Sequence, residues 1–179
     1  MDYTELSKLL YHGSFVAVSE IDLSRSVPKK DFGQGFYTTN DKEQAEKFAR
    51  LKAKREHTEK GYVSVFRFQN TGDFSVRKFG AVDEEWFDFV LRNRGFAEFA
   101  SPAQREAFDI VIGPVADDAV GLVLNQFIVG TYGVPSSAEA RETAIRLLLT
   151  QKLHNQLFFG AEQAVSHLIF QEAYDVRSD

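Results

Sequence analysis

The sequence predicts an α+β domain built on a largely antiparallel or mixed sheet. Strand-like and helix-like segments are interspersed along the chain, without the repeated strand–helix–strand period of a doubly wound parallel sheet. Residues 62–68 form the clearest strand and are apolar enough on both faces to lie centrally in a sheet. A chain of 179 residues is long enough for one substantial core and too short for two ordinary domains, so we expect a single domain over residues 1–179.

The first part of the chain predicts two extended segments and then a capped helix. Residues 9–12 form a strand, and residues 15–18 continue as a second extended piece. Asn40 is a good N-cap residue, and Glu43 three residues later completes the spacing of a capping box. The buried face of this helix is predicted to carry Ala45, Phe48, Ala49 and Ala53.

The middle of the chain predicts two strands and a second helix. Gly61 ends the first helix, strand 62–68 follows, and a turn leads to a further strand over residues 74–79. Asp83 caps the next helix, and Gly95 lies beyond its end. The buried stripe of that helix is predicted to consist of Trp86, Phe87, Val90 and Leu91.

After an exposed connection over residues 97–108, residues 109–115 predict a buried strand. Asp117 or Asp118 then begins a helix. The inward positions of that helix are Val120, Val123, Leu124 and Phe127.

The last part of the chain predicts a further helix, a strand, a short helix and a final strand. Ser136 with Glu139 has capping-box spacing and precedes the helix. Residues 157–159 form the strand, residues 161–167 the short helix and residues 168–170 the final strand. The inward positions of the first of these helices are Ala144, Leu147 and Leu148.

Composition excludes several classes of function. The chain has no cysteine, which rules out disulfides, thiolate metal sites and cysteine nucleophiles, and no histidine pair has the spacing of a helical metal site. No apolar run approaches a membrane span, and the N-terminus does not resemble a signal peptide, so we expect a cytoplasmic protein. The net charge of −5 argues against general binding to nucleic acid. Seventeen phenylalanines predict an aromatic core and leave rings to line a pocket.

One segment changes at its middle from a glycine-containing turn pattern to a strand pattern. It is Asp-Phe-Gly-Gln-Gly-Phe-Tyr-Thr-Thr, at residues 31–39. Two glycines precede an aromatic pair, which suggests that the backbone passes close to something flat and bulky, such as a ligand ring or another strand. Tyr37 would then offer a face for stacking. The alternative is an ordinary glycine turn that leads into a core strand.

A second segment, Leu-Tyr-His-Gly-Ser at residues 10–14, places a histidine next to a glycine at the end of a predicted strand. An imidazole beside a bare backbone amide offers two polar contacts to the edge of a ligand. The alternative is that His12 is a hydrogen-bonded structural histidine.

Together the two segments resemble the ADP-ribosyltransferase superfamily, in the branch whose active site carries His, Tyr and an acidic or amide residue. The order of residues in the two segments most resembles a bacterial domain family of that superfamily, which is known mainly from sequence. The resemblance continues through residues 83–87, 109–115 and 155–159 and so spans nearly the whole chain. It implies split mixed or antiparallel β-sheets flanked by helices.

The resemblance also implies that the chain binds NAD+ as a substrate in a cleft between two small sheets, without a metal. His12 would hydrogen-bond the adenosine ribose, and the Gly13 backbone would hold the nicotinamide carboxamide. Tyr37 would stack on the nicotinamide ring, and Ser14 would add a polar contact near the amide. Arg25 is a looser candidate for the diphosphate and is equally explained as a surface arginine.

The third position of the resemblance falls on Gln156, where the superfamily usually has glutamate. An amide can bond ribose hydroxyls but lacks the negative charge that favours a cationic transition state, so catalysis is more in question than NAD+ binding. Glu162 could compensate if the Gly160 turn folds back, although an acidic residue in a first helical turn also stabilises the helix.

From these features we expect an NAD+-dependent mono-ADP-ribosyltransferase. The acidic balance favours a protein acceptor over nucleic acid. The resemblance also suggests a bacterial toxin with a small cognate antitoxin. The alternatives are a weak or inactive module that binds NAD+ or a partner, an NAD+ glycohydrolase, and an enzyme that transfers a phosphate from RNA to NAD+.

Overall fold

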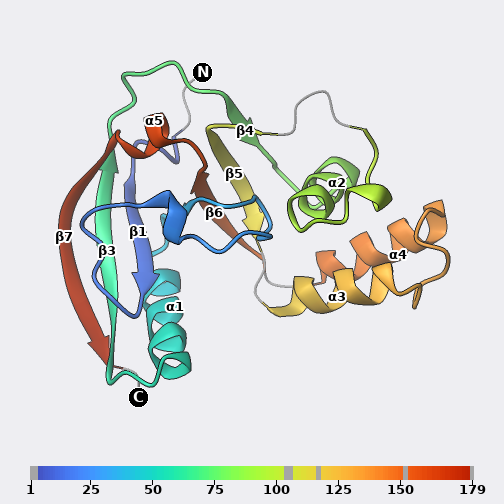
Figure 1. The fold of residues 1–179 in the computed structure, drawn as a ribbon, viewed down its shortest axis with the longest axis horizontal. Coiled ribbons are helices and arrows are strands. Elements are labelled where there is room, and N and C mark those ends of the chain that lie inside the picture. Colours follow the sequence, from blue (N-terminus) through green and yellow to red (C-terminus); the bar gives the residue numbers. More distant parts are fainter. Residues whose placement is uncertain (1–3, 103–106, 116–117, 151–152, 178–179) are drawn as a thin grey trace.

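The structure is a computed structural model that describes residues 4–102, 107–115, 118–150 and 153–177. Two β-sheets stand side by side, with one helix beside the first strand and the helices from the middle of the chain beyond the second sheet (Figure 1). The strands are β1 (Leu9–Ser14), β2 (Phe36–Thr38), β3 (Lys60–Phe68), β4 (Val76–Lys78), β5 (Ile110–Val115), β6 (His154–Phe159) and β7 (Leu168–Arg177). The α-helices are α1 (Lys42–Arg55), α2 (Glu84–Asn93), α3 (Asp118–Ile128), α4 (Ala138–Leu149) and α5 (Glu162–Val165). Two short 3-10 helices are η1 (Leu23–Arg25) and η2 (Ala97–Phe99).

The α+β class with split sheets is confirmed. The first sheet has the order β1-β3-β7 and is antiparallel throughout. The second has the order β2-β6-β5-β4 and is mixed, because β4 pairs with β5 in parallel. Among the described residues, one isolated bridge, between Tyr11 and Thr39, joins β1 of the first sheet to the end of β2 of the second.

Helix α1 packs on the outer face of the first sheet at close range. Its buried stripe contains only Ala45, Ala49 and Ala53. On the facing strands, a Cβ added to Gly13 would lie 2.2 Å from the Ala45 oxygen, and one added to Gly61 would lie 2.4 Å from the Ala49 oxygen. Small residues on both sides therefore let the helix backbone approach the sheet.

Three details of α1 correct the sequence prediction. Asp41, and not Asn40, is the N-cap, and its carboxylate accepts from the N–H groups of residues 43 and 44. The Asn40 amide is used elsewhere, since it donates to the backbone oxygens of Glu5 and Leu9. Phe48 is 42% exposed, because a helix held this close to the sheet has room only for alanine beneath it. The helix ends at Arg55, and Gly61 lies within β3.

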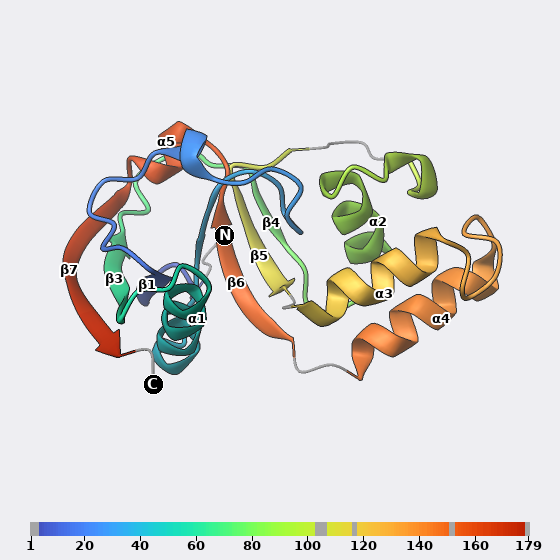
Figure 2. The same ribbon diagram turned by 60° about the horizontal axis from the view of Figure 1, so that its bottom comes forward.

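Apolar side chains form one core between the two sheets and a larger one between the second sheet and α2–α4. Figure 2 shows the second sheet between the first sheet and helices α2–α4. The inner core contains Leu10, Phe36, Phe66, Phe68, Ile110, Ile112, Leu157 and Phe159. The predicted stripe of α2 is confirmed, since Trp86, Phe87, Val90 and Leu91 are fully buried. The Trp86 indole also donates to the Pro114 oxygen at 2.8 Å and so fixes α2 to the end of β5.

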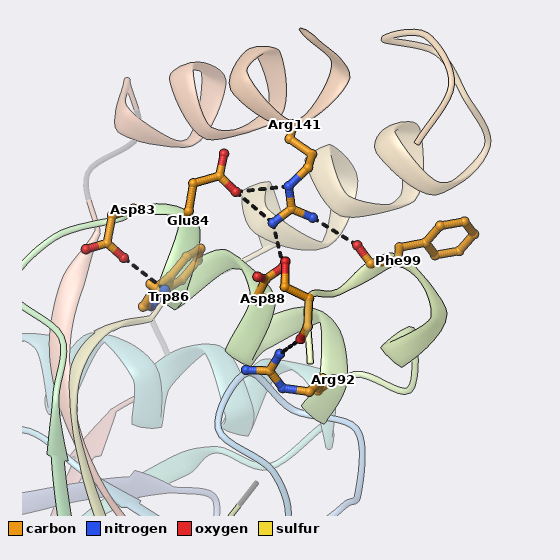
Figure 3. Close-up of polar contacts among 8 residues, drawn as sticks. Asp83, Glu84, Trp86, Asp88, Arg92, Phe99 and Arg141 are labelled. Atoms are coloured by element: carbon orange, nitrogen blue, oxygen red, sulfur yellow. Dashed lines mark hydrogen bonds and ion pairs between the residues drawn. The ribbon is translucent and has the colours of Figure 1, made fainter. Parts of the chain in front are cut away.

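Arg141 of α4 ties the helical layer together (Figure 3). Its guanidinium bonds Glu84 at 2.7 and 2.9 Å and Asp88 at 2.5 Å, both on α2, and the backbone oxygen of Phe99 at 2.9 Å. It also lies over the Phe87 ring, 5.3 Å from the ring centre. One mostly buried cation thus joins α4 to polar groups of α2 and η2.

Other expected boundaries move by a few residues. Ser137, not Ser136, caps α4, because the chain makes a turn in which the Ser137 N–H donates to the Val134 oxygen before the helix starts. Leu147 is 36% exposed rather than inward. Residues 15–18 are not a strand, since the Val18 N–H bonds the Ser64 side chain and joins no ladder.

The strands also differ in length from the expectations. β4 covers only residues 76–78, whereas β6 and β7 run well beyond the apolar cores 157–159 and 168–170. The expected helix at 161–167 is the shorter α5. Residues 97–102 include η2, and residues 107–108 belong to no helix or strand. Asp117 and residues 103–106 lie outside the described residues.

Candidate functional site

The two segments singled out in the sequence meet where β1 and β2 separate. Tyr11 and Thr39 exchange both backbone hydrogen bonds, at 2.8 and 2.9 Å. In an antiparallel register, Gly13 and Tyr37 are the next residues that face each other across the two strands. The His12 imidazole reaches from one strand to the other, with Nδ1 2.7 Å from the Tyr37 backbone oxygen. We call this place, made by residues 12–14 and 36–39, the sheet junction.

Gly13 presents its backbone to the sheet junction. Tyr11 directs its N–H and C=O toward β2, and successive residues of a strand alternate between its two edges. The N–H and C=O of Gly13 therefore point to the same edge as those of Tyr11. Because α1 leaves no room for a side chain at Gly13, only backbone donors and acceptors are available there.

His12 is neutral at pH 7 and has a defined tautomer. A carbonyl oxygen only accepts, so Nδ1 carries the proton, and Nε2 is left as an acceptor. The ring stacks on Phe36, with centroids 4.4 Å apart. Burial lowers the pKa of His12 to about 4, and the nearby positive charges of Lys30 and Lys52 act in the same direction.

Tyr37 uses its hydroxyl to close the glycine loop and keeps its ring at the surface of the second sheet. The hydroxyl donates to the Gly33 oxygen at 2.8 Å and accepts from the Phe32 N–H at 3.1 Å. The ring is half-buried and packs against Phe158 and Phe32, with centroids 5.0 and 6.5 Å away. Burial raises the pKa of the phenol, so Tyr37 is not an acid or base at neutral pH. Its ring also packs against the core between the second sheet and α2–α4.

The two positions in residues 31–39 require glycine for different structural reasons. Gly33 has a φ of 101°, a conformation that favours glycine. A Cβ on Gly35 would lie 2.3 Å from the Phe158 ring and 2.6 Å from the Phe159 oxygen. The flat object that the backbone passes is therefore the neighbouring strand β6, which was one of the two possibilities the sequence left open.

Gln156 lies on β6 and on the same face of the second sheet as the Tyr37 ring. Tyr37 pairs with Phe158, and residues two apart on a strand point to the same face. Gln156 is half-buried, and no described residue hydrogen-bonds its side-chain amide. The His12 ring lies on the opposite face, against Phe36. His12 can therefore contact a different part of one extended ligand than Tyr37 and Gln156 do, but not the same ring.

The remaining candidates, Ser14, Arg25 and Glu162, lie at different distances from the sheet junction. Ser14 ends β1 and is half-buried beside the sheet junction. Arg25 is exposed on η1, and no described residue forms a hydrogen bond or ion pair with its side chain. Glu162 lies in α5, in a shallow hollow whose lining also includes Glu20 and Leu168 but neither Tyr37 nor Gln156.

Two features of the site were not anticipated from the sequence. Asp31, nearly fully buried, pairs with Arg94 at 2.6 Å and anchors the glycine loop to the end of α2. Lys30 places its ammonium 5.0 Å from the centre of the Tyr37 ring. Both residues stand in or next to the glycine segment. However, nothing in their spacing indicates a partner 63 positions away in the chain or a fold-back onto the ring.

Comparison with known proteins assigns the family. Residues 8–170 match the family described as "Protein of unknown function (DUF3990)", and since the match covers most of the chain, the protein belongs to this family. No curated protein matches the chain, and neither does any solved structure.

Two further properties concern the described residues alone. In this part of the chain, no three histidine, aspartate or glutamate side chains gather in a way that could hold a metal ion. None of the helices described is both long and apolar enough to cross a membrane.

Proposed function

We propose that the protein is an NAD+-dependent mono-ADP-ribosyltransferase. The observation that carries this proposal is the sheet junction, where the His12 ring bonds the Tyr37 backbone oxygen and the Gly13 backbone lies beside them, at the place where β1 and β2 join the two small sheets. These are the residues on which the resemblance to that superfamily depends, and they stand 25 positions apart in the chain.

The geometry supports a distinct task for each group. The Gly13 N–H and C=O together match a carboxamide, which needs one acceptor and one donor. The Tyr37 ring offers a face for the nicotinamide. His12 Nε2, an acceptor on the other face, suits a ribose hydroxyl of the adenosine half. A dinucleotide held at both ends in this way keeps a bent shape.

The reaction breaks the bond between the ribose C1′ and the nicotinamide nitrogen. Nicotinamide leaves with the bonding electron pair as a neutral molecule, and positive charge develops on the ribose. A nucleophilic atom of the acceptor then bonds to C1′ and loses its proton. The protein contributes by holding the leaving group and the ribose in place while this charge forms.

Gln156 is the side chain best placed to bond the ribose on the nicotinamide side. Its amide is polar, half-buried and without a partner among the described residues. It orients the ribose but supplies no negative charge, which predicts slow catalysis. Gln156→Glu is therefore expected to raise the rate of nicotinamide release by tenfold or more, a magnitude on the order of one oriented electrostatic contact.

A matched control for this substitution is Asn155→Asp, which adds the same charge one residue away at an exposed position. Neighbouring strand residues point to opposite faces, so this variant should leave the rate unchanged. Equal effects of the two variants would show that charge in general, and not the place of Gln156, matters.

The acceptor is proposed to be a protein, on the basis of the net charge of −5. A role as the toxin of a toxin–antitoxin pair, with a small antitoxin as partner, remains part of the same proposal and rests on the resemblance alone.

The experiment that tests the function is incubation with NAD+ labelled in the adenosine half, with and without cell lysate. Transfer gives a labelled macromolecular band. A glycohydrolase gives free nicotinamide without a band, and a binding module gives neither. Tyr37→Ala should abolish NAD+ binding in each case, whereas Tyr37→Phe, which keeps the ring, should retain it. Binding by the alanine variant at full strength would contradict the proposed site.

A further inference from the structure

Lys30 occupies an unusual position for a lysine. Its ammonium lies 5.0 Å from the centre of the Tyr37 ring, and the side chain is half-buried. The loop holds it there, because the Lys30 backbone oxygen accepts from the Gly33 N–H at 3.1 Å. No described carboxylate pairs with it, and the adjacent Asp31 is bonded to Arg94 instead.

Lys52 lies on α1, the helix that packs against Gly13. It is one turn beyond Ala49, whose backbone nitrogen lies 2.9 Å from the Cβ that Gly13 lacks. Lys52 is also half-buried and has no carboxylate partner among the described residues. Burial lowers the pKa of Lys30 and of His12, and the positive charge of Lys52 acts in the same direction on both.

The Lys30 ammonium lies over the Tyr37 ring and the Lys52 ammonium 5.5 Å from the centre of the Phe48 ring, but neither has a carboxylate partner among the described residues, which is unfavourable for the protein alone. Each partly buried cation loses hydration and gains repulsion from its neighbour. An anion that bonds both ammonium groups would offset both costs, since charge-assisted hydrogen bonds to phosphate oxygens are among the stronger ones.

We propose that Lys30 and Lys52 bind the diphosphate of the dinucleotide substrate at the sheet junction. This inference rests on the proposed function. If His12 and Tyr37 hold the two ends of the molecule, the diphosphate that joins them lies between these residues, within reach of Lys30. Arg25, exposed on η1, has no such position.

The Tyr37 ring gives Lys30 a second role. The nicotinamide ring of NAD+ carries a positive charge. It therefore competes with the Lys30 ammonium for the face of the Tyr37 ring. The flexible four-carbon stem of lysine lets the ammonium turn from the ring to the phosphates. The same side chain thereby covers Tyr37 or binds the anion, but not both.

Calorimetric titration with four ligands tests this assignment. NAD+ and ADP-ribose carry the diphosphate, whereas nicotinamide and adenosine do not. Lys30→Gln and Lys52→Gln should each weaken NAD+ and ADP-ribose by roughly tenfold, the effect of one charge-assisted bond, and leave the two uncharged ligands unaffected. Lys30→Arg should restore most of the loss. Lys54→Gln, exposed on the same helix, should bind like the wild type.

The outcomes separate this inference from the proposed function. If the wild type binds NAD+ and both glutamine variants bind it equally well, the lysine assignment is wrong and the function stands. Arg25→Gln as the only weakened variant would also overturn it and move the diphosphate to η1. If the wild type binds neither NAD+ nor ADP-ribose, the proposed function fails as well.

Discussion

His12 shows how the surroundings of one residue decide its chemistry. In the sequence, it could be a ligand-binding group or a structural histidine, and the structure makes it a bridge between two strands with one free acceptor. Its stacking on Phe36 and its burial keep the ring neutral. The same surroundings predict a measurable dependence of stability on pH.

The His12 pKa is near 6.5 in the unfolded chain and about 4 in the folded protein. Between these values the unfolded chain binds more protons, so the free energy of unfolding should fall as the pH falls from about 6.5 to about 4. The loss attributable to this residue is about 3 kcal/mol. Urea unfolding of the wild type and of His12→Asn at several pH values measures it, because asparagine keeps a donor near the Tyr37 oxygen but does not titrate. Parallel pH profiles for the two proteins would contradict the prediction.

Tyr37 provides a second prediction at this scale. Tyr37→Phe removes the hydroxyl that joins the Gly33 oxygen to the Phe32 N–H, and should lower the free energy of unfolding by about 2 kcal/mol. Affinity for NAD+ should change much less, because the ring stays in place. A large loss of affinity with unchanged stability would mean that the hydroxyl contacts the ligand rather than the loop.

Single residues also show where the sequence was a sufficient guide. Asp83 caps α2 as predicted, because its local pattern had one reading. Asp41 caps α1 because the Asn40 amide donates instead to the backbone oxygens of Glu5 and Leu9. Both of these residues are more than 30 positions away in the chain. Local patterns identify the groups that can cap a helix, and distant contacts decide which one does.

At the scale of elements, the packing of α1 on β1 fixes the backbone of the candidate site. Gly13→Ala would bring a methyl group against the backbone of α1, where neither Ala45 nor Ala49 can move without shifting the helix. We expect a loss of about 3 kcal/mol in the free energy of unfolding. Gly80→Ala is the control, since nothing lies within 4 Å of its added Cβ, and it should be nearly neutral. Thermal or urea unfolding compares them, and equal stability of the two variants would contradict the packing described.

The helical layer predicts a similar contrast. Arg141→Met leaves Asp88, whose side chain is 11% exposed, without its cation, and should cost about 3 kcal/mol. Arg146→Met removes the same charge from an exposed position of α4 and should change stability by less than about 0.5 kcal/mol. Chemical denaturation measures both. A loss for Arg141→Met no larger than for Arg146→Met would show that the Arg141 contacts do not hold α4 on α2.

Elements with strong periodic patterns, such as α2 and β3, were predicted well from sequence. The ends of β6 and β7 were not, because their polar residues carry no strand pattern and are extended only by pairing with β5 and β3. Phe48 and Leu147 were assigned to buried faces on spacing alone. Their exposure follows from how closely α1 approaches its sheet and how α4 lies on its neighbours, which spacing does not report.

For the whole molecule, the decisive feature is that the sheet is divided in two at β1 and β2. The class of fold followed from the order of segments, but the local sequence does not indicate where the sheets separate; in the described part of the chain, the bridge between residues 11 and 39 joins them. The resemblance in sequence identified His12, Gly13 and Tyr37 as a group. Only the three-dimensional arrangement shows that His12 and Tyr37 present their rings on opposite faces, and that Lys30 lies over the tyrosine.

The most direct test is a crystal structure with an NAD+ analogue in which a carbon replaces the ring oxygen of the nicotinamide ribose, so that the bond to nicotinamide is not cleaved. The account predicts the carboxamide within hydrogen-bond distance of the Gly13 N–H and C=O, with the nicotinamide ring against Tyr37. An analogue bound elsewhere, such as the hollow beside Glu162, or absent from crystals soaked at saturating concentration, would contradict it.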